Sequence, residues 1–228
     1  MLTFNIITIF PEMFKSFLET SLIKRAIKKK FLKINLINLR DFAADRHRSI
    51  DDSPFGGGFG MVFRVDVMFK ALKKLGNQKG RVILLTPRGK RFEQATAKRL
   101  SQEKTITLIC GHYEGFDERI HHYLVDEQIS IGDYVLTGGE IPACVLIDCI
   151  GRLVKGVVGK EGSIKEESFD INGRKLLEYP QYTRPEIFQP DHKTKWKVPK
   201  VLLSGDHQKI KEWRNRHTRK VWQRPVKY

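Results

Sequence analysis

The chain has 228 residues, of which 40% are hydrophobic and 30% charged, enough for one large domain or for one domain with a smaller second one. No stretch approaches the ~18 to 20 apolar residues of a membrane span, and no secretory signal is recognisable, so we expect a cytoplasmic protein without a membrane segment. Its three cysteines lack CxxC spacing and its histidines are scattered, so we expect reduced core thiols and no metal site.

The first 60 residues predict a strand, a helix and a second strand. Residues 4–10 are apolar and β-rich, which is typical of a buried strand. Pro11 opens a stretch with apolar residues at helical spacing over 12–29, and residues 33–39 alternate like a second strand. Residues 41–60 have the charge and glycine content of a loop.

Strands and helices continue to alternate to about residue 155. We expect helices over 65–75, 92–101 and 140–154, and strands over 81–86, 105–110 and 127–136. This alternation predicts an α/β domain, a parallel sheet with helices on both faces. Ligands bind such sheets at the carboxyl ends of the strands, where this chain places its glycine-rich loops.

The charge distribution predicts a second, basic domain. The net charge is +16, and residues 174–228 carry 15 Lys/Arg against 5 Asp/Glu, or +10. This bias favours a polyanionic partner such as nucleic acid, with a solvated basic surface as the alternative. We expect a first domain over 1–158, a polar linker or lid over 159–175, and a small, mainly helical domain over 176–228, with its clearest helix over 206–222.

Two stretches are rich in glycine, Asp51 to Met61 and Ser130 to Glu140. Glycine at this density costs backbone entropy and is kept where the chain needs a positive φ or lies against a ligand. Neither stretch contains GxGxxG or a Walker A loop, so a nucleotide-like ligand would be held in another way. Two plain surface turns are the alternative.

Several blocks follow one another along nearly the whole chain: FPEMF at 10–14, DD with GGG and GM at 51–61, ICG with YEG and DER at 109–119, the second glycine stretch, YTRP at 182–185 and VLLSG at 201–205. In this order they resemble the bacterial tRNA (guanine-N1)-methyltransferase family of the knotted SPOUT class. The resemblance implies a deep trefoil knot near residues 80–140 of the catalytic domain, which ordinary chain topology avoids. It implies S-adenosylmethionine as methyl donor and transfer to N1 of the guanine just 3′ of the tRNA anticodon. It also implies a homodimer with an active site shared between subunits.

The resemblance also assigns binding residues. The donor pocket would be lined by Leu84, Leu85, Thr86, Pro87, Gly111, His112, Tyr113, Glu114, Ile131, Gly132, Tyr134, Leu136, Gly138, Gly139 and Pro142. Each group follows a predicted strand, although core packing explains Leu84, Leu85 and Leu136 equally well. The anticodon stem-loop of tRNA would meet Gly57, Gly58, Gly60, Arg184, Ser204, His207 and Arg214.

Guanine N1 carries a proton near neutral pH, so methyl transfer needs a carboxylate that takes this proton and a cation that stabilises charge on O6. The arginine of the family pattern matches Arg152. The aspartate of its DSF motif matches Glu167, which is one methylene longer, and Asp170 is a rival for the same role.

The chain departs from the family pattern at three other positions: Phe59 replaces a small residue or proline, His112 an arginine, and Asp206 an asparagine. Two other functions stay open. The glycine loops would serve a ribose 2′-O-methyltransferase of the same class equally well, and the basic segment would suit a non-enzymatic RNA-binding protein.

Overall fold

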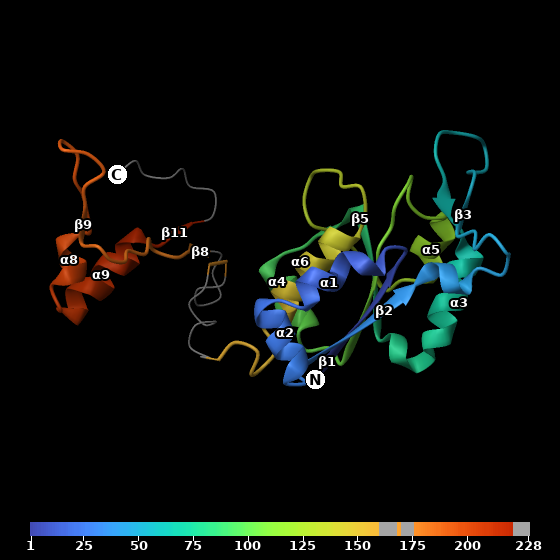
Figure 1. The fold of residues 1–228 in the computed structure, drawn as a ribbon, viewed down its shortest axis with the longest axis horizontal. Coiled ribbons are helices and arrows are strands. Elements are labelled where there is room, and N and C mark those ends of the chain that lie inside the picture. The colour runs from blue at the N-terminus through green and yellow to red at the C-terminus, as the bar shows by residue number, and fades with distance from the viewer. Residues whose placement is uncertain (160–167, 170–175, 221–228) are drawn as a thin grey trace. The chain divides into compact units, whose positions relative to one another are not determined.

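The structure is a computed structural model that describes residues 1–159, 168–169 and 176–220. It divides into two compact units, Met1–Gly159 and Lys160–Tyr228, each described by itself (Figure 1). The expected linker lies largely outside the described residues, so the domain boundaries stay a prediction. Among the described residues, no helix has the length and apolar character that crossing a membrane requires.

A five-stranded parallel sheet forms the centre of the first unit, which confirms the predicted α/β architecture. The strand order is β2-β1-β6-β5-β7. The bounds are Leu2–Thr8 for β1, Leu32–Asn38 for β2, Arg81–Arg91 for β5, Thr105–Ile109 for β6 and Glu127–Ser130 for β7. The inner strands are apolar runs because a parallel sheet is buried on both faces.

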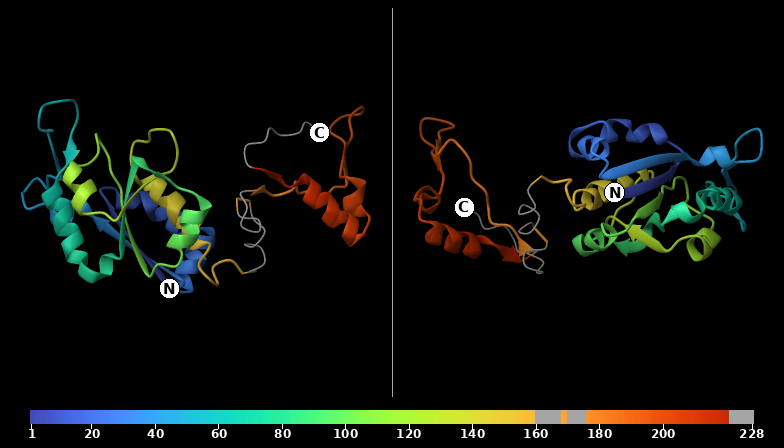
Figure 2. Two further views of the ribbon diagram at one scale, coloured as in Figure 1. Left: turned by 180° about the vertical axis from the view of Figure 1, so that it is seen from behind. Right: turned by 90° about the horizontal axis from the view of Figure 1, so that it is seen from below.

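Helices cover both faces of this sheet (Figure 2). Side chains alternate along a strand, so Phe4 and Ile6 enter one core cluster and Ile7 the other. The first cluster lies under η1 (Pro11–Phe14), α1 (Lys15–Leu18), α2 (Ser21–Lys28), α4 (Gln94–Leu100) and α6 (Glu140–Gly151). The second lies under η2 (Leu39–Phe42), α3 (Val65–Leu75) and α5 (Glu118–Tyr123), and η3 (Gly76–Lys79) follows α3.

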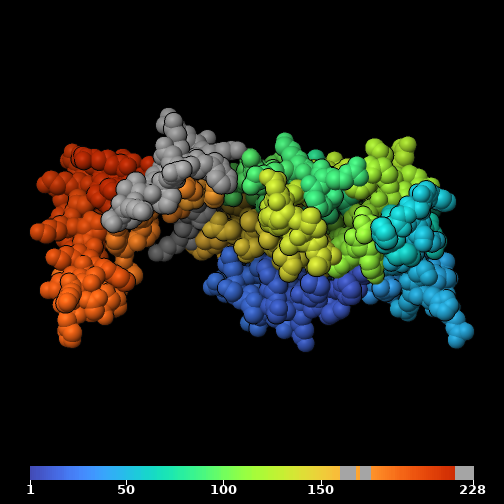
Figure 3. Space-filling view, turned by 90° about the horizontal axis from the view of Figure 1, so that it is seen from above, coloured from blue at the N-terminus to red at the C-terminus, as the bar shows by residue number. Residues whose placement is uncertain are grey.

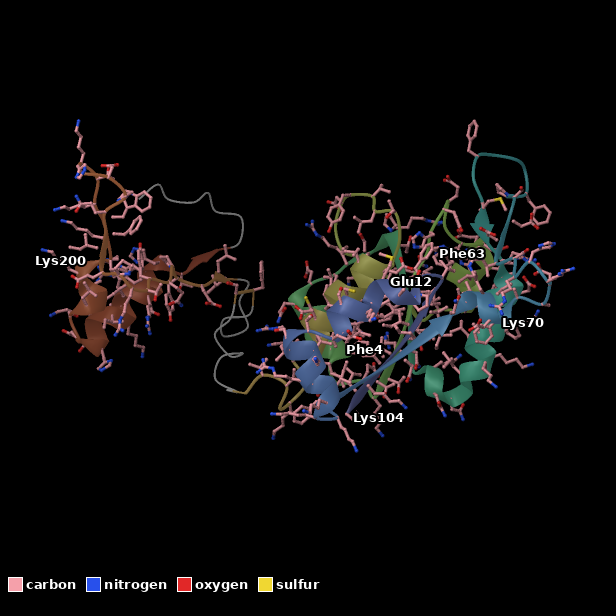
Figure 4. All side chains as sticks on the ribbon, in the orientation of Figure 1. Phe4, Glu12, Phe63, Lys70, Lys104 and Lys200 are labelled. Carbon is pink, nitrogen blue, oxygen red and sulfur yellow. The ribbon has the colours of Figure 1, made fainter. Side chains whose placement is uncertain are left out.

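The first unit has a buried apolar core and a charged surface. Phe4 and Phe63 are fully buried, whereas Lys70 and Lys104 project from the surface (Figure 4). All three cysteines have free thiols; Cys110 is buried, whereas Cys144 and Cys149 are half-buried. Burial raises the pKa of Cys144 to about 11, so this thiol stays protonated near neutral pH.

Three predicted elements differ from the structure. The single helix expected over 12–29 is broken, because Thr20 is extended and Ser21 has φ +48°. The third strand does not end before Pro87 but continues as β5 to Arg91. The last strand, expected over 127–136, ends at Ser130, and the glycine loop begins there. Helix α5 has no counterpart among the predicted elements.

A short antiparallel pair, β3 (Asp51–Asp52) and β4 (Val62–Phe63), holds the ends of the first glycine-rich loop together. Within residues 41–60, where we expected a loop, only β3 and the end of η2 have regular secondary structure. The tip of the loop carries Phe55 and Phe59, which are almost fully exposed.

The second unit contains two helices, α8 (Lys200–Leu203) and α9 (His207–His217), among its described residues. It also contains the antiparallel pairs β9 (Ile187–Phe188) with β10 (Trp196–Lys197) and β8 (Leu176–Leu177) with β11 (Arg219–Lys220). Helix α9 begins after Asp206, whose side chain accepts bonds of 3.1 Å from the Gln208 and Lys209 amides. The helix expected over 206–222 therefore exists but ends at His217.

Candidate active site

A cavity of about 370 Å³ lies at the carboxyl ends of β6 and β7, against residues 85–88 in the second half of β5. Figure 3 looks onto the face where the green-to-yellow loops that follow these strands gather. The cavity walls are Leu85, Thr86, Pro87, Arg88, Gly111, His112, Tyr113, Glu114, Gly115, Phe116, His121, Ile129, Ser130, Ile131, Gly132, Tyr134, Val135, Leu136, Thr137, Gly138, Gly139 and Pro142. Its volume is in the range of small-molecule sites.

The structure brings together the residues assigned to the donor pocket, with one exception. Leu84 is absent from the walls and has 0% exposure in the second core cluster. Its neighbour Leu85 lines the cavity because consecutive strand residues face opposite sides of the sheet. That these residues bind the methyl donor stays a prediction.

Close contacts explain two of the cavity glycines, with side chains at Gly138 and with main chain at Gly139. A Cβ on Gly138 would collide with the His112 ring and lie 2.6 Å from Oε2 of Glu140. A Cβ on Gly139 would lie 2.6 Å from the Cα atom of Cys110. The Gly139 amide donates to the Gly111 carbonyl at 2.9 Å, so the loops after β6 and β7 lie directly against each other.

A buried carboxylate adjoins the cavity. Glu140 is 1% exposed, and its Oε2 lies 2.7 Å from Nε2 of His112. Its Oε1 accepts a 2.6 Å bond from the Thr8 hydroxyl, which itself accepts from the Phe10 amide at 2.9 Å. An ionised Glu140 can only accept, so with that state the N–H of His112 Nε2 is the donor in this contact. These bonds compensate for the burial of Glu140 and join three segments of the chain.

The first glycine-rich loop reaches the cavity only at its end. Gly60 has φ +77°, and a Cβ there would collide with the Glu114 side chain. The Glu114 amide donates to the Met61 carbonyl at 3.1 Å. Gly57 has open space around it, and the nearest atom to a Cβ on Gly58 is in Pro54, at 3.7 Å. These two predicted RNA-contacting positions are therefore at the open part of the loop.

Arg88 lines the cavity, although the sequence did not single it out. Its Nη1 and Nη2 atoms donate to the two Glu118 oxygens at 2.8 and 3.2 Å. These hydrogen bonds lower the pKa of Glu118 and raise that of Arg88. The other cavity residues that sequence reasoning missed are Gly115, Phe116, His121, Ile129, Ser130, Val135 and Thr137. Ile129 and Ser130 were missed because the predicted strand extends to 136 and the observed one ends at Ser130. Arg88 and His121 were missed because they depend on the unexpected extension of β5 and on α5.

Arg152, one of the two predicted catalytic residues, is not among the described residues that wall the cavity. Arg152 caps the carboxyl end of α6, and at 1.5 Å per residue it lies about 20 Å along the helix from Gly139. Glu167 and its rival Asp170 lie outside the described residues. Arg184, Ser204, His207 and Arg214 belong to the second unit, where the Arg214 guanidinium lies 4.8 Å from the centre of the Tyr179 ring.

A parallel α/β unit with a cavity of this size at its strand ends is typical of proteins that bind a small ligand, among them many enzymes. The family model described as tRNA (Guanine-1)-methyltransferase TrmD matches residues 2–226. A tRNA (guanine-N(1)-)-methyltransferase of Pelotomaculum thermopropionicum is 50% identical over 218 residues, 94% of this chain and 84% of that protein. A Clostridioides difficile protein of the same name is 47% identical over 222 residues, 96% of this chain and 93% of its own length. The chain belongs to the tRNA (guanine-1)-methyltransferase family, as the sequence blocks predicted.

Proposed function

We propose that the protein transfers a methyl group from S-adenosylmethionine to N1 of the guanine just 3′ of the anticodon in tRNA. Membership in the methyltransferase family supports the reaction. The observation that carries the donor assignment is the cavity, whose walls contain every residue assigned to the donor except Leu84.

The cavity fits an adenosyl donor chemically. Leu85, Ile131 and Leu136 offer apolar surface for a purine ring, and the bare main chain at Gly111 and Gly139 allows close approach. Glu114 adds a carboxylate to the same walls, which suits a ligand that carries positive charge. When bound, the donor supplies an electrophilic methyl group on a good leaving group.

The protein's own task is to prepare the acceptor. Glu167 would take the N1 proton of guanine, with Asp170 as the alternative base, so that the N1 electron pair forms the new N–C bond. The guanidinium of Arg152 would stabilise the negative charge that develops on O6. Glu167→Gln should lower the methylation rate at least 100-fold while donor affinity stays unchanged. The same loss in Asp170→Asn, with near-normal Glu167→Gln, would assign the base to Asp170.

A homodimer with a shared site would resolve the separation of Arg152 from its own cavity. Helix α6 is apolar on nearly all sides, yet Ile141 and Val145 are 54% and 37% exposed. A helix of this kind is normally covered on every face. In a two-fold dimer with the α6 helices antiparallel, Arg152 of each subunit would approach the cavity end of its partner's helix.

The described part of the second unit supports the anticodon stem-loop as the RNA partner. Arg184, Lys209 and Arg214 are exposed there, as RNA phosphates require. Tyr182 and Trp213 are neighbours, with ring centres 6.2 Å apart, and the Trp213 ring stacks on His217 at 4.0 Å. Trp213 therefore has a packing role, whereas the basic side chains are available to RNA.

The trefoil knot and the cytoplasmic location belong to the same proposal. Placement of β5 between β6 and β7 supports the knot, as does the return of the loop after β7 to Gly111. A tRNA substrate supports the cytoplasm as the site of action.

Methylation of unmodified tRNA with a guanine next to the anticodon tests the function directly. Mass spectrometry of the digested nucleosides should show 1-methylguanosine. A ribose-methylated nucleoside would instead indicate the 2′-O-methyltransferase activity. RNA binding without donor binding would indicate a non-enzymatic protein.

A further inference from the structure

Arg88 is the sole lysine or arginine among the described residues that wall the cavity. It lies on the part of β5 that continues beyond Pro87, next to α5. Its side chain is 66% exposed, so its charge is available to a ligand at the cavity mouth.

The hydrogen bonds to Glu118 leave part of the guanidinium unused. Arginine has five N–H groups in a planar fork. Glu118 accepts one from Nη1 and one from Nη2, and no further acceptor occurs in the described part of the chain. The edge that carries Nε therefore remains open for a second carboxylate, and a guanidinium can bind such a group in bidentate fashion.

The charges of the cavity walls match an amino acid zwitterion. A carboxylate that enters a cavity with apolar and glycine walls requires a cation or several donors. Arg88 supplies the cation, and Glu114 in the same walls supplies a counter-charge for an ammonium group.

We propose that Arg88 binds the α-carboxylate of the donor's amino acid moiety and that Glu118 holds the guanidinium at the cavity mouth. Arg88 thereby selects nucleosides that carry an amino acid tail. The proposal rests on the proposed function for the identity of the donor.

Two nucleosides distinguish binding of the donor's amino acid moiety from binding of the rest of the donor. S-adenosylhomocysteine carries the amino acid, whereas 5′-methylthioadenosine has the same adenosine and thioether without it. Calorimetric titration of the full chain with each should show that Arg88→Met weakens S-adenosylhomocysteine binding about tenfold or more, the usual effect of losing a charge-assisted hydrogen bond. Affinity for 5′-methylthioadenosine should be unchanged in Arg88→Met.

Arg91→Met is the matched control. Arg91 lies on the same strand, outside the cavity walls, and its side chain is 3.7 Å from Asp133. This variant should alter the affinity for neither nucleoside.

Two results would overturn the role of Arg88. One is equal weakening of both nucleosides by Arg88→Met, which would indicate that the side chain only maintains the cavity. The other is unchanged affinity for both nucleosides in Arg88→Met, which would show that the guanidinium does not bind the carboxylate. Unmodified protein that bound neither nucleoside would refute the donor assignment itself, and the Arg88 proposal with it. Circular dichroism melting of each variant shows whether it is folded.

Discussion

Nε2 of His112 lies 2.7 Å from Oε2 of Glu140, a residue 28 positions later in the chain. Because Thr8 donates to the other oxygen of Glu140, the carboxylate joins β1, the loop after β6 and the start of α6. The structure shows the partner of His112 to be this buried acid. The cavity wall therefore depends on a small polar network rather than on packing alone.

Thr8→Val should destabilise the first unit, because the buried Glu140 carboxylate loses a hydrogen bond of 2.6 Å. We expect a loss of about 1.5 to 3 kcal/mol in the free energy of unfolding, typical of hydrogen bonds to charged groups. Urea unfolding followed by far-UV circular dichroism measures it, since tryptophan occurs only at positions 196, 213 and 222 of the sequence. The control is Thr20→Val, whose hydroxyl bonds the Ser16 carbonyl at the surface. Equal effects of the two variants would contradict the prediction.

Gly138→Ala should disrupt the cavity, because a Cβ there would collide with the His112 ring. We expect the affinity for S-adenosylhomocysteine to fall at least tenfold in calorimetric titration. Gly159→Ala is the matched control, since a Cβ at Gly159 meets no atom of the described residues within 4 Å. Unchanged affinity in Gly138→Ala would show that the close contact between Gly138 and the His112 ring is unimportant for binding.

Arg152→Ala should lower the methylation rate at least 100-fold, the order of loss expected for a group that stabilises an oxyanion. If the site is shared, a mixture of Arg152→Ala and Gly138→Ala subunits should recover activity, because each mixed dimer contains one intact cavity facing one intact arginine. At a donor concentration well below the Kd of the Gly138→Ala variant, random exchange makes half of the dimers mixed, so the recovered rate should be roughly a quarter of the unmodified rate. A site contained within one subunit would give no recovery.

Glu127 should contribute to the acid sensitivity of the fold. Burial raises the pKa of Glu127, but hydrogen bonds from Arg99 and Arg81 outweigh it, and the net shift is downward from 4.5. A lowered folded pKa gives stability that is present above pH 4.5 and is lost as the pH falls through the folded pKa. Both arginines are at least one-third exposed, so we expect Glu127→Gln to cost only about 1 kcal/mol at pH 7. Melting temperatures from pH 7 to pH 3 should decline less steeply in the variant; an unchanged profile would rule out this role.

Local patterns in the sequence were sufficient for most of the sheet and for helix α3, found at residues 65–75 as predicted. They failed where a single backbone conformation decides the outcome. Nothing in the apolar spacing over 12–29 signals the positive φ of Ser21 that breaks the helix. Likewise, Pro87 is usually a reason to end a strand, but β5 continues because Lys90 and Arg91 pair with β7.

The sequence by itself determined the family, the strand ends at which a ligand would bind, and the glycines that allow close approach, because these depend on short blocks of neighbouring residues. Only the tertiary structure decided that Leu85 and not Leu84 reaches the cavity, that His112 meets Glu140, and that Arg88 pairs with Glu118. These relationships depend on strand order and on which face of the sheet each side chain occupies, and they join residues 28 and 30 positions apart. Contacts of this range are set by how the whole core packs, so spacing along the chain does not reveal them.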